Sequence, residues 1–203
     1  MKKAVVWDLG GVLIDWNPRY LYSKVFTDEK EMEYFLNHVC TLEWNYQGDA
    51  GRLFADCIGE LSAQFPQYEK QIKLWIEREG EMFSGPIPEN VQILNELEAV
   101  GHDLYCVTNW SGELFPIAQR RFPFILKFKD VVVSGIEKVT KPNPQIFKIL
   151  FERNNLAPEQ CVFIDDREDN IKAATALGMQ GICFQNPRQL RVELQKTGFL
   201  TEK

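Results

Sequence analysis

The chain has 203 residues, of which 45% are hydrophobic and 26% are charged, and its formal net charge is −6. A chain of this size buries roughly 70% of the surface that it exposes when unfolded, so its core needs neither disulfides nor a structural metal. The acidic balance disfavours nucleic acid and acidic membrane surfaces as partners, but it leaves open an anionic small molecule bound at a locally positive site.

The five cysteines are isolated in sequence, and no pair has the C-x-x-C spacing of a zinc or redox motif. Most lie inside apolar runs, as is typical of small buried side chains in a reducing compartment. The first apolar run ends at Asp8 and is too short for the core of a signal peptide. No stretch approaches the roughly 18 apolar residues of a membrane span. We therefore expect a cytoplasmic protein, and the sequence leaves its oligomeric state open.

The first predicted strand covers residues 5–7 and runs directly into Asp8. Such a short apolar run without alternation is typical of a strand buried on both faces of a parallel sheet. Gly10 and Gly11 follow, and two glycines let the backbone approach a ligand closely. An Asn-Pro pair at 17–18 then predicts a helix start, with Asn17 as the N-cap.

A long helical segment follows the first strand. From residue 19 to about 83, apolar side chains recur at helical spacing and no convincing strand is predicted. The sequence Ser-Gly-Pro-Ile-Pro at 84–88 indicates a linker back to the sheet. We therefore expect an α/β core domain made of residues 1–16 and 85–203, with a helical insertion at 17–84.

From Asn90 onward the chain alternates between helical and strand patterns, which is typical of βαβ units. With right-handed crossovers, this order predicts a Rossmann-like doubly wound parallel sheet of five strands, with the first strand near its centre. The predicted helices lie at 90–100, 113–121, 143–154, 168–177 and 187–196, and the predicted strands at 103–108, 130–134, 161–165 and 181–184.

Polar residues follow three of these strands directly. Asp8 follows the first, Thr108-Asn109 end the strand at 103–108, and Asp165-Asp166 end the strand at 161–165. Ligands of open α/β sheets bind outside the carboxyl ends of the strands. A carboxylate there can attack phosphorus, and a hydroxyl beside exposed N–H groups suits phosphate oxygens. Each feature alone is explained more simply by a turn or a helix cap, but their coincidence predicts phosphoryl chemistry.

Two further features supply charge to this crevice. Lys141 precedes Pro142 and Pro144, so its loop is stiff, and a fixed ammonium there neutralises both a nucleophile and a phosphate. The adjacent acids Asp165 and Asp166 are costly at a buried strand end unless a cation balances them. Hard oxygen ligands of this kind suit Mg²⁺. An N-cap role in the next helix explains Asp166 or Asp169 singly, but it explains the adjacent pair poorly.

These residues resemble the four motifs of the haloacid dehalogenase-like (HAD) superfamily, in order and in spacing. The helical insertion resembles the cap that closes over the site in one group of the superfamily. The Asp-Leu-Gly start and the Phe-Ile-Asp-Asp…Asn ending resemble the α-D-glucose-1-phosphate phosphatase group most. The four motifs are Asp8-Leu9-Gly10-Gly11-Val12, Thr108-Asn109, Lys141-Pro142 and Phe163-Ile164-Asp165-Asp166.

The resemblance implies a role for each motif residue. Asp8 is the expected nucleophile, Lys141 orients the phosphate, and Mg²⁺ is the expected cofactor. Phosphate binding is assigned to Thr108, Asn109 and Lys141. The metal is assigned to Asp8, Asp166 and the backbone carbonyl of Gly10. Support of the metal from its second shell is assigned to Asp165 and Asn170.

One position departs from the family pattern. Most phosphatases of the superfamily carry a second Asp two positions after the nucleophile, where it acts as general acid and base, and here that position is Gly10. Missing acid–base help is worth a factor of about 10²–10⁴. Asp15 is the nearest carboxylate in sequence, but we expect it to act in an N-cap or a hinge. Activity is then either modest or limited to leaving groups that need little protonation.

The sequence therefore favours a Mg²⁺-dependent phosphomonoesterase acting on a small phosphate ester, such as the sugar phosphate glucose 1-phosphate. A 2-haloacid dehalogenase uses no metal, so the Asp165-Asp166 pair disfavours it. A phosphomutase needs an acid–base residue, so Gly10 disfavours it. A catalytically weak phosphate-ester-binding protein of the same fold is supported by Gly10 alone. The physiological substrate and the cap residues that select it stay open.

Overall fold

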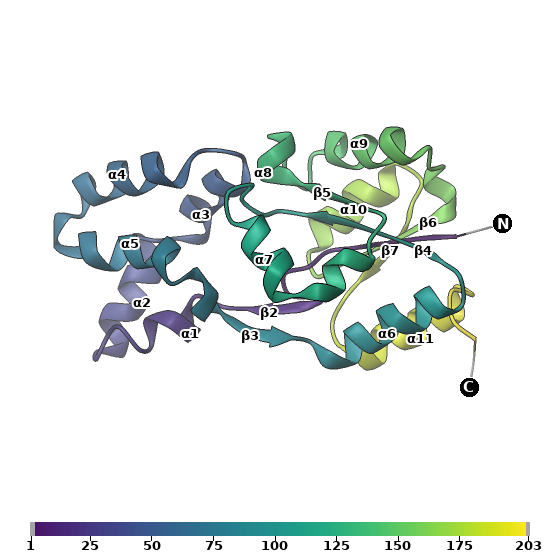
Figure 1. The fold of residues 1–203 in the computed structure, drawn as a ribbon, viewed down its shortest axis with the longest axis horizontal. Helices are drawn as coiled ribbons and strands as arrows, with labels where there is room; N and C mark the ends of the chain where they lie inside the picture. The colour runs from purple at the N-terminus through teal and green to yellow at the C-terminus, as the bar shows by residue number, and fades with distance from the viewer. Residues whose placement is uncertain (1–2, 202–203) are drawn as a thin grey trace.

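A computed structural model describes residues 3–201 of the chain. Its centre is a five-stranded sheet with the order β5-β4-β1-β6-β7, and every neighbouring pair is parallel (Figure 1). The prediction that the first strand lies at the centre is confirmed. The strands are β1 (Ala4–Trp7), β4 (Asp103–Thr108), β5 (Asp130–Val133), β6 (Cys161–Asp165) and β7 (Gln180–Cys183).

Helices cover both faces of the sheet, as Figure 1 shows. Successive residues of a strand point to opposite faces. Accordingly, Val5 and Trp7 belong to one core cluster with side chains of α6, α7 and α11, whereas Ala4 and Val6 belong to a second cluster with side chains of α9 and α10. The helices of this domain are α6 (Pro88–Ala99), α7 (Phe115–Arg121), α8 (Ser134–Glu137), α9 (Pro144–Asn154), α10 (Glu168–Ala176) and α11 (Pro187–Lys196).

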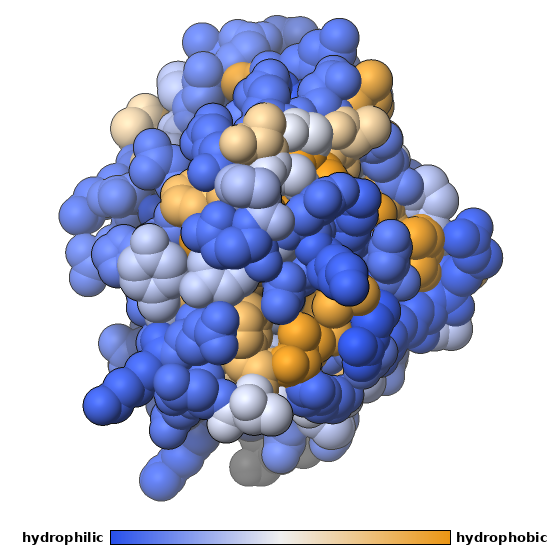
Figure 2. All heavy atoms as spheres, turned by 90° about the vertical axis from the view of Figure 1, so that its left-hand side faces the viewer, coloured by the Kyte–Doolittle hydropathy of each residue, from blue (hydrophilic) through white to orange (hydrophobic). Residues whose placement is uncertain are grey.

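A separate group of helices lies at one end of the molecule (Figure 1). Hydrophilic residues cover most of its outer face, and apolar side chains show only in limited areas (Figure 2). Many of its large apolar side chains are buried and join the core cluster that contains β1. Among them are Trp44 and Trp75, whose ring centroids lie 5.4 Å apart. These helices are α1 (Arg19–Tyr22), α2 (Glu29–His38), α3 (Leu42–Asp49), α4 (Phe54–Gln64) and α5 (Glu69–Glu77), with a 3₁₀ turn at Glu79–Met82.

Two short strands connect the helical group to the sheet, and the sequence did not predict them. β2 (Ile14–Trp16) and β3 (Phe83–Pro86) pair antiparallel, so the segment expected to be a linker is partly a strand. Three or four residues give no recognisable strand pattern, and β3 also contains Gly and Pro, which are uncommon inside strands. The helix expected to start at Pro18 begins one residue later, and the side chain of Asn17 accepts a hydrogen bond from Arg19 N at 3.0 Å.

The boundaries of the predicted cap, at residues 17 and 84, stay a prediction.

All five cysteines are free thiols, and four of them are buried. Within residues 3–201, no helix has the length and apolarity that crossing a membrane requires.

Candidate active site

Asp8 lies at the carboxyl end of the central strand. Its neighbour Trp7 is in register with Cys106 and Ile164, so the ends of β4 and β6 flank it on either side. The Asp8 N–H donates to Ile164 O at 2.9 Å, which fixes the backbone. Oδ1 of Asp8 accepts hydrogen bonds from Leu9 N at 2.7 Å and contacts Lys141 Nζ at 2.9 Å. Within the part of the chain that the structure describes, Oδ2 accepts no hydrogen bond, and it is the oxygen left for a ligand.

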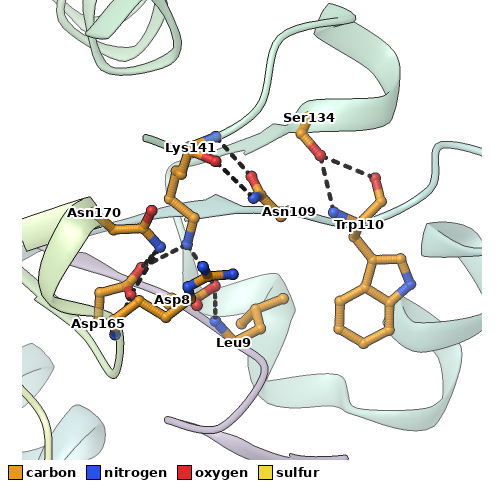
Figure 3. A network of polar contacts seen from close by, with 9 residues as sticks. Asp8, Leu9, Asn109, Trp110, Ser134, Lys141, Asp165 and Asn170 are labelled. Carbon is orange, nitrogen blue, oxygen red and sulfur yellow. Dashed lines mark hydrogen bonds and ion pairs between the residues drawn. The ribbon is translucent and has the colours of Figure 1, made fainter. Parts of the chain in front are cut away.

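The Lys141 ammonium is buried between two carboxylates, with only 2% of the residue exposed. Nζ lies 2.9 Å from Asp8 Oδ1 and 2.7 Å from Asp165 Oδ2 (Figure 3). The Asn109 amide holds the Lys141 backbone, since Lys141 N donates to Asn109 Oδ1 at 2.8 Å and Asn109 Nδ2 donates to Lys141 O at 3.1 Å. The Asn109 side chain therefore holds the backbone of the lysine in place, and its assignment to phosphate binding stays a prediction.

Asp165 is fully buried and surrounded by donors. It accepts hydrogen bonds from Lys141 Nζ, from Asn170 Nδ2 at 3.0 Å and from Arg167 N at 2.8 Å. The neighbouring Asp166 is exposed and points back over the loop that follows β1. A Cβ on Gly11 would lie 2.8 Å from Asp166 Oδ2, and Gly11 has a φ of +73°, so this position requires glycine.

The carboxyl ends of β1 and β6, which form the sheet edge at this site, thus hold more negative than positive charge. Asp8, Asp165 and Asp166 each offer an oxygen within 4.8 Å of the others, and Lys141 is the cation that contacts two of them. Burial raises the pKa of Asp8 to about 7 while Lys141 opposes the rise. Burial and the charge of Asp165 raise the pKa of Asp166. Closely spaced carboxylates with incomplete neutralisation fit a divalent cation.

Other predicted residues lie close by with fewer specific contacts. Thr108 is the last residue of β4 and is buried. Gly10 borders a cavity of about 110 Å³ between the sheet edge and the helical group. The cavity is lined by apolar side chains, from Trp16, Phe54, Trp75, Met82, Trp110 and Leu114, and by polar residues, namely Asn45, Asp49, Glu79, Asn109 and Ser111.

The sequence did not single out Asn45, Asp49 or Glu79. These residues come from α3 and from the 3₁₀ turn before β3, and no motif marks them. The available signal was weak: Asp49 lies between two glycines, Gly48 and Gly51, at the end of a predicted helical stretch. Which helix face points into the cavity is decided only by tertiary packing.

Comparison with known proteins identifies the family. A model of haloacid dehalogenase-like hydrolases matches residues 2–178, so the chain belongs to this family of hydrolases. Acyl-CoA dehydrogenase family member 10 from Mus musculus is 28% identical over 215 residues, which are 95% of this chain but 19% of that protein. A sesquiterpene phosphatase from Aspergillus oryzae is 24% identical over 196 residues, covering 96% of this chain and 95% of its own.

A phosphorylated carbohydrates phosphatase from Thermotoga maritima is 24% identical over 196 residues, covering 89% of this chain and 83% of its own. Among solved structures, a HAD family enzyme from Bacteroides thetaiotaomicron in complex with magnesium and inorganic phosphate has a TM-score of 0.69 at 23% identity, covering 91% and 95% of the two chains. L-2-haloacid dehalogenase from Xanthobacter autotrophicus has a TM-score of 0.63 at 16% identity, covering 98% and 85%. These two likenesses establish the fold.

Proposed function

We propose that the protein is a Mg²⁺-dependent phosphomonoesterase that works through an aspartyl-phosphate. The observation that carries this proposal is the state of Asp8: Oδ1 is held by Leu9 N and Lys141, which leaves Oδ2 for attack on phosphorus. The cluster of three carboxylates around a single ammonium supports a divalent cation. The phosphatases among the relatives support the reaction class.

In this reaction, Oδ2 of Asp8 attacks phosphorus and the ester oxygen leaves. Lys141 neutralises charge on Asp8 and on the incoming phosphate, and its backbone stays in place because Asn109 holds it. We assign phosphate binding to the Thr108 hydroxyl and to the backbone that follows it. Bound Mg²⁺ adds positive charge at the phosphoryl oxygens.

The residues assigned to the metal are Asp8, Asp166 and the carbonyl of Gly10. Asp165 and Asn170 serve this site indirectly. Both oxygens of Asp165 already accept hydrogen bonds, so this carboxylate orients Lys141 and the loop of Asp166 rather than offering a free ligand atom.

The cavity beside Gly10 supports a small alcohol as the leaving group. Its volume of about 110 Å³ is well below the 300–1,000 Å³ of pockets for drug-sized ligands. Between residues 3 and 201, no Lys or Arg lines it, so a second anionic group would find no cationic partner there. A small neutral moiety such as a sugar fits, and we propose that residues 17–84 form the cap that encloses it.

A panel of phosphate esters tests this function. We expect phosphate release from small esters with Mg²⁺, loss of release with EDTA, and no halide release from 2-chloropropionate. Asp8→Asn should lower turnover by about 10⁴–10⁶ with the fold retained, since the change is nearly isosteric. Metal-independent halide release that depends on Asp8 would instead make the protein a dehalogenase.

A further inference from the structure

No general acid stands at position 10, and a replacement for it is expected in the cavity that Gly10 borders. A Cβ on Gly10 would meet no atom within 4 Å, so the space that a side chain at this position would enter is open. Two carboxylates of the helical group, Asp49 and Glu79, line the same cavity. The proton donor missing at position 10 therefore has two counterparts that line the same cavity.

Asp49 is fixed to the core rather than to the helical group alone. Ser134 Oγ donates to Asp49 O at 2.6 Å and accepts from Trp110 N at 3.0 Å, and Figure 3 shows Ser134 beside Trp110. The Asp49 carboxylate accepts from Asn45 Nδ2 at 3.2 Å and from the backbone N–H of Ser111. Its side chain is thereby anchored to the loop that begins at Thr108-Asn109, where the phosphate is expected.

Glu79 is buried on the same cavity, with 6% of the residue exposed. Its carboxylate interacts with the Trp110 side chain and lies close enough to Asp49 for their charges to repel. Arg121 lies nearby, but its guanidinium is bound to the carbonyls of Gly80 and Phe83. Between residues 3 and 201, neither Asp49 nor Glu79 forms an ion pair with a Lys or Arg.

Burial raises the pKa of both carboxyls of this pair. It raises the pKa of Asp49 to about 7, against the hydrogen bond from Ser111. It also raises the pKa of Glu79 to about 7, and the charge of Asp49 adds to the rise while Arg121 opposes it. A general acid is most effective when its pKa lies near the working pH.

We propose, on the basis of the phosphatase function above, that Asp49 is the general acid and base of this enzyme and that Glu79 is its positioning partner. When Asp8 Oδ2 bonds to phosphorus, the bond to the leaving oxygen breaks. That oxygen keeps the electron pair and takes the proton of Asp49. The Asp49 carboxylate then removes a proton from water as the water oxygen attacks phosphorus. The bond to Asp8 breaks, its electron pair returns to the Asp8 carboxylate, and phosphate is released.

The test uses two leaving groups and the isosteric variant Asp49→Asn. With an alkyl phosphate, which needs protonation, kcat should fall by about 10²–10⁴. With p-nitrophenyl phosphate, whose leaving group is stable as an anion, formation of the aspartyl-phosphate should change much less. Hydrolysis of the intermediate has lost its base, so rapid mixing should show a burst of one p-nitrophenolate per active site followed by slow turnover. The parent protein should show no such burst.

A rescue experiment separates proton transfer from a structural effect. Adding Gly10→Asp to Asp49→Asn places a carboxyl in the open space beside the nucleophile, so alkyl phosphate turnover should recover at least tenfold. The matched control Gly10→Asn in the same background has similar size but no proton to give, and should restore nothing. Glu79→Gln should shift the alkaline limb of the kcat profile for the alkyl phosphate with a smaller loss at its optimum.

The outcomes distinguish a failure of the role of Asp49 from a failure of the proposed phosphatase function. Equal losses for both leaving groups in Asp49→Asn, with no burst, overturn the role of Asp49. A loss specific to the alkyl phosphate in Glu79→Gln but not in Asp49→Asn overturns it too. The proposed phosphatase function itself fails only if the parent protein releases no phosphate from any ester with Mg²⁺, or if Asp8→Asn keeps full activity.

Discussion

The sheet edge around Asp8 and the cavity beside Gly10 both bury carboxylates, but the negative charge is balanced differently in the two places. At the sheet edge, Asp8 and Asp165 share the Lys141 ammonium, whereas none of the described residues that line the cavity of Asp49 and Glu79 has a basic side chain. Burial raises the pKa of Asp8, of Asp49 and of Glu79 to about 7, but the Lys141 ammonium in contact with Asp8 opposes the rise only at the sheet edge. In our proposal the carboxylate beside the lysine is the nucleophile and the carboxyl in the cavity is the acid, because the surroundings differ.

The largest effect is expected from removing the cation at the sheet edge. Lys141→Met leaves Asp8 and Asp165 buried without the ammonium that contacts both, and breaking a buried pair costs about 3–5 kcal/mol. In a protein of this size each kcal/mol lowers Tm by about 2–4 °C, so thermal unfolding should show a drop of roughly 6–20 °C. Lys148→Met, an exposed change on α9, is the control. An unchanged Tm for Lys141→Met would mean that these carboxylates are not held by the lysine.

The second effect concerns the metal, which only the sheet edge should bind. At a Mg²⁺ concentration 100 times the Kd, binding should stabilise the parent protein by about 2.7 kcal/mol, and EDTA should reverse the rise in Tm. Asp166→Ala should abolish the rise. Asp169→Ala, whose side chain is 70% exposed, should keep it. A full rise in Asp166→Ala would remove Asp166 from the ligand set.

These two regions also differ in how far the sequence could predict them. Asp8, Thr108 and Asp165 are recognisable because each follows a short apolar run, and parallel strands place such ends at one edge. The family and the α/β sheet follow from the same residues. The clamp between Asn109 and the Lys141 backbone lies beyond this reasoning, since a side-chain amide can equally bind phosphate.

The cavity escaped prediction for a physical reason. Asp49 and Glu79 gain their properties from burial in a cavity that is also lined by residues distant in sequence, such as Trp110 and Ser111. Their own neighbours in sequence are ordinary for solvated helices. The pairing of β2 with β3 escaped for a related reason, because three or four residues carry too little pattern to specify a strand.

The third prediction concerns the protonation of Glu79 in the cavity and its effect on the free energy of unfolding. The pKa of Glu79 is raised from 4.5 to about 7, so the folded state holds this proton more tightly than the unfolded state does. The associated stability is complete below pH of about 4.5 and is lost as the pH rises through 7. Glu79→Gln removes that loss, so it should stabilise the protein at pH 8 relative to the parent by on the order of 1–3 kcal/mol, with less gain at pH 5.

Thermal unfolding of both proteins at several pH values checks this prediction. Glu43→Gln is the control, since Glu43 is exposed on α3 and its replacement should leave the pH profile unchanged. If Glu79→Gln were equally stable relative to the parent at pH 5 and pH 8, the cavity would hold an ionised Glu79 and the contrast with the sheet edge would fail.

The smallest effect is expected at Asp15, the carboxylate nearest to Gly10 in sequence. Asp15 lies in β2, and its Oδ2 accepts a hydrogen bond from Tyr20 Oη at 2.8 Å, so it belongs to the connection between the helical group and the sheet. Asp15→Ala and Tyr20→Phe remove the same hydrogen bond, and each should cost about 0.5–1.5 kcal/mol. The double variant should lose little more than either single variant, which urea unfolding can measure.

Because the Asp15 side chain does not line the cavity, Asp15→Ala should change alkyl and aryl phosphate turnover by the same small factor. A loss of 10² or more confined to the alkyl ester would make Asp15, and not Asp49, the source of the proton.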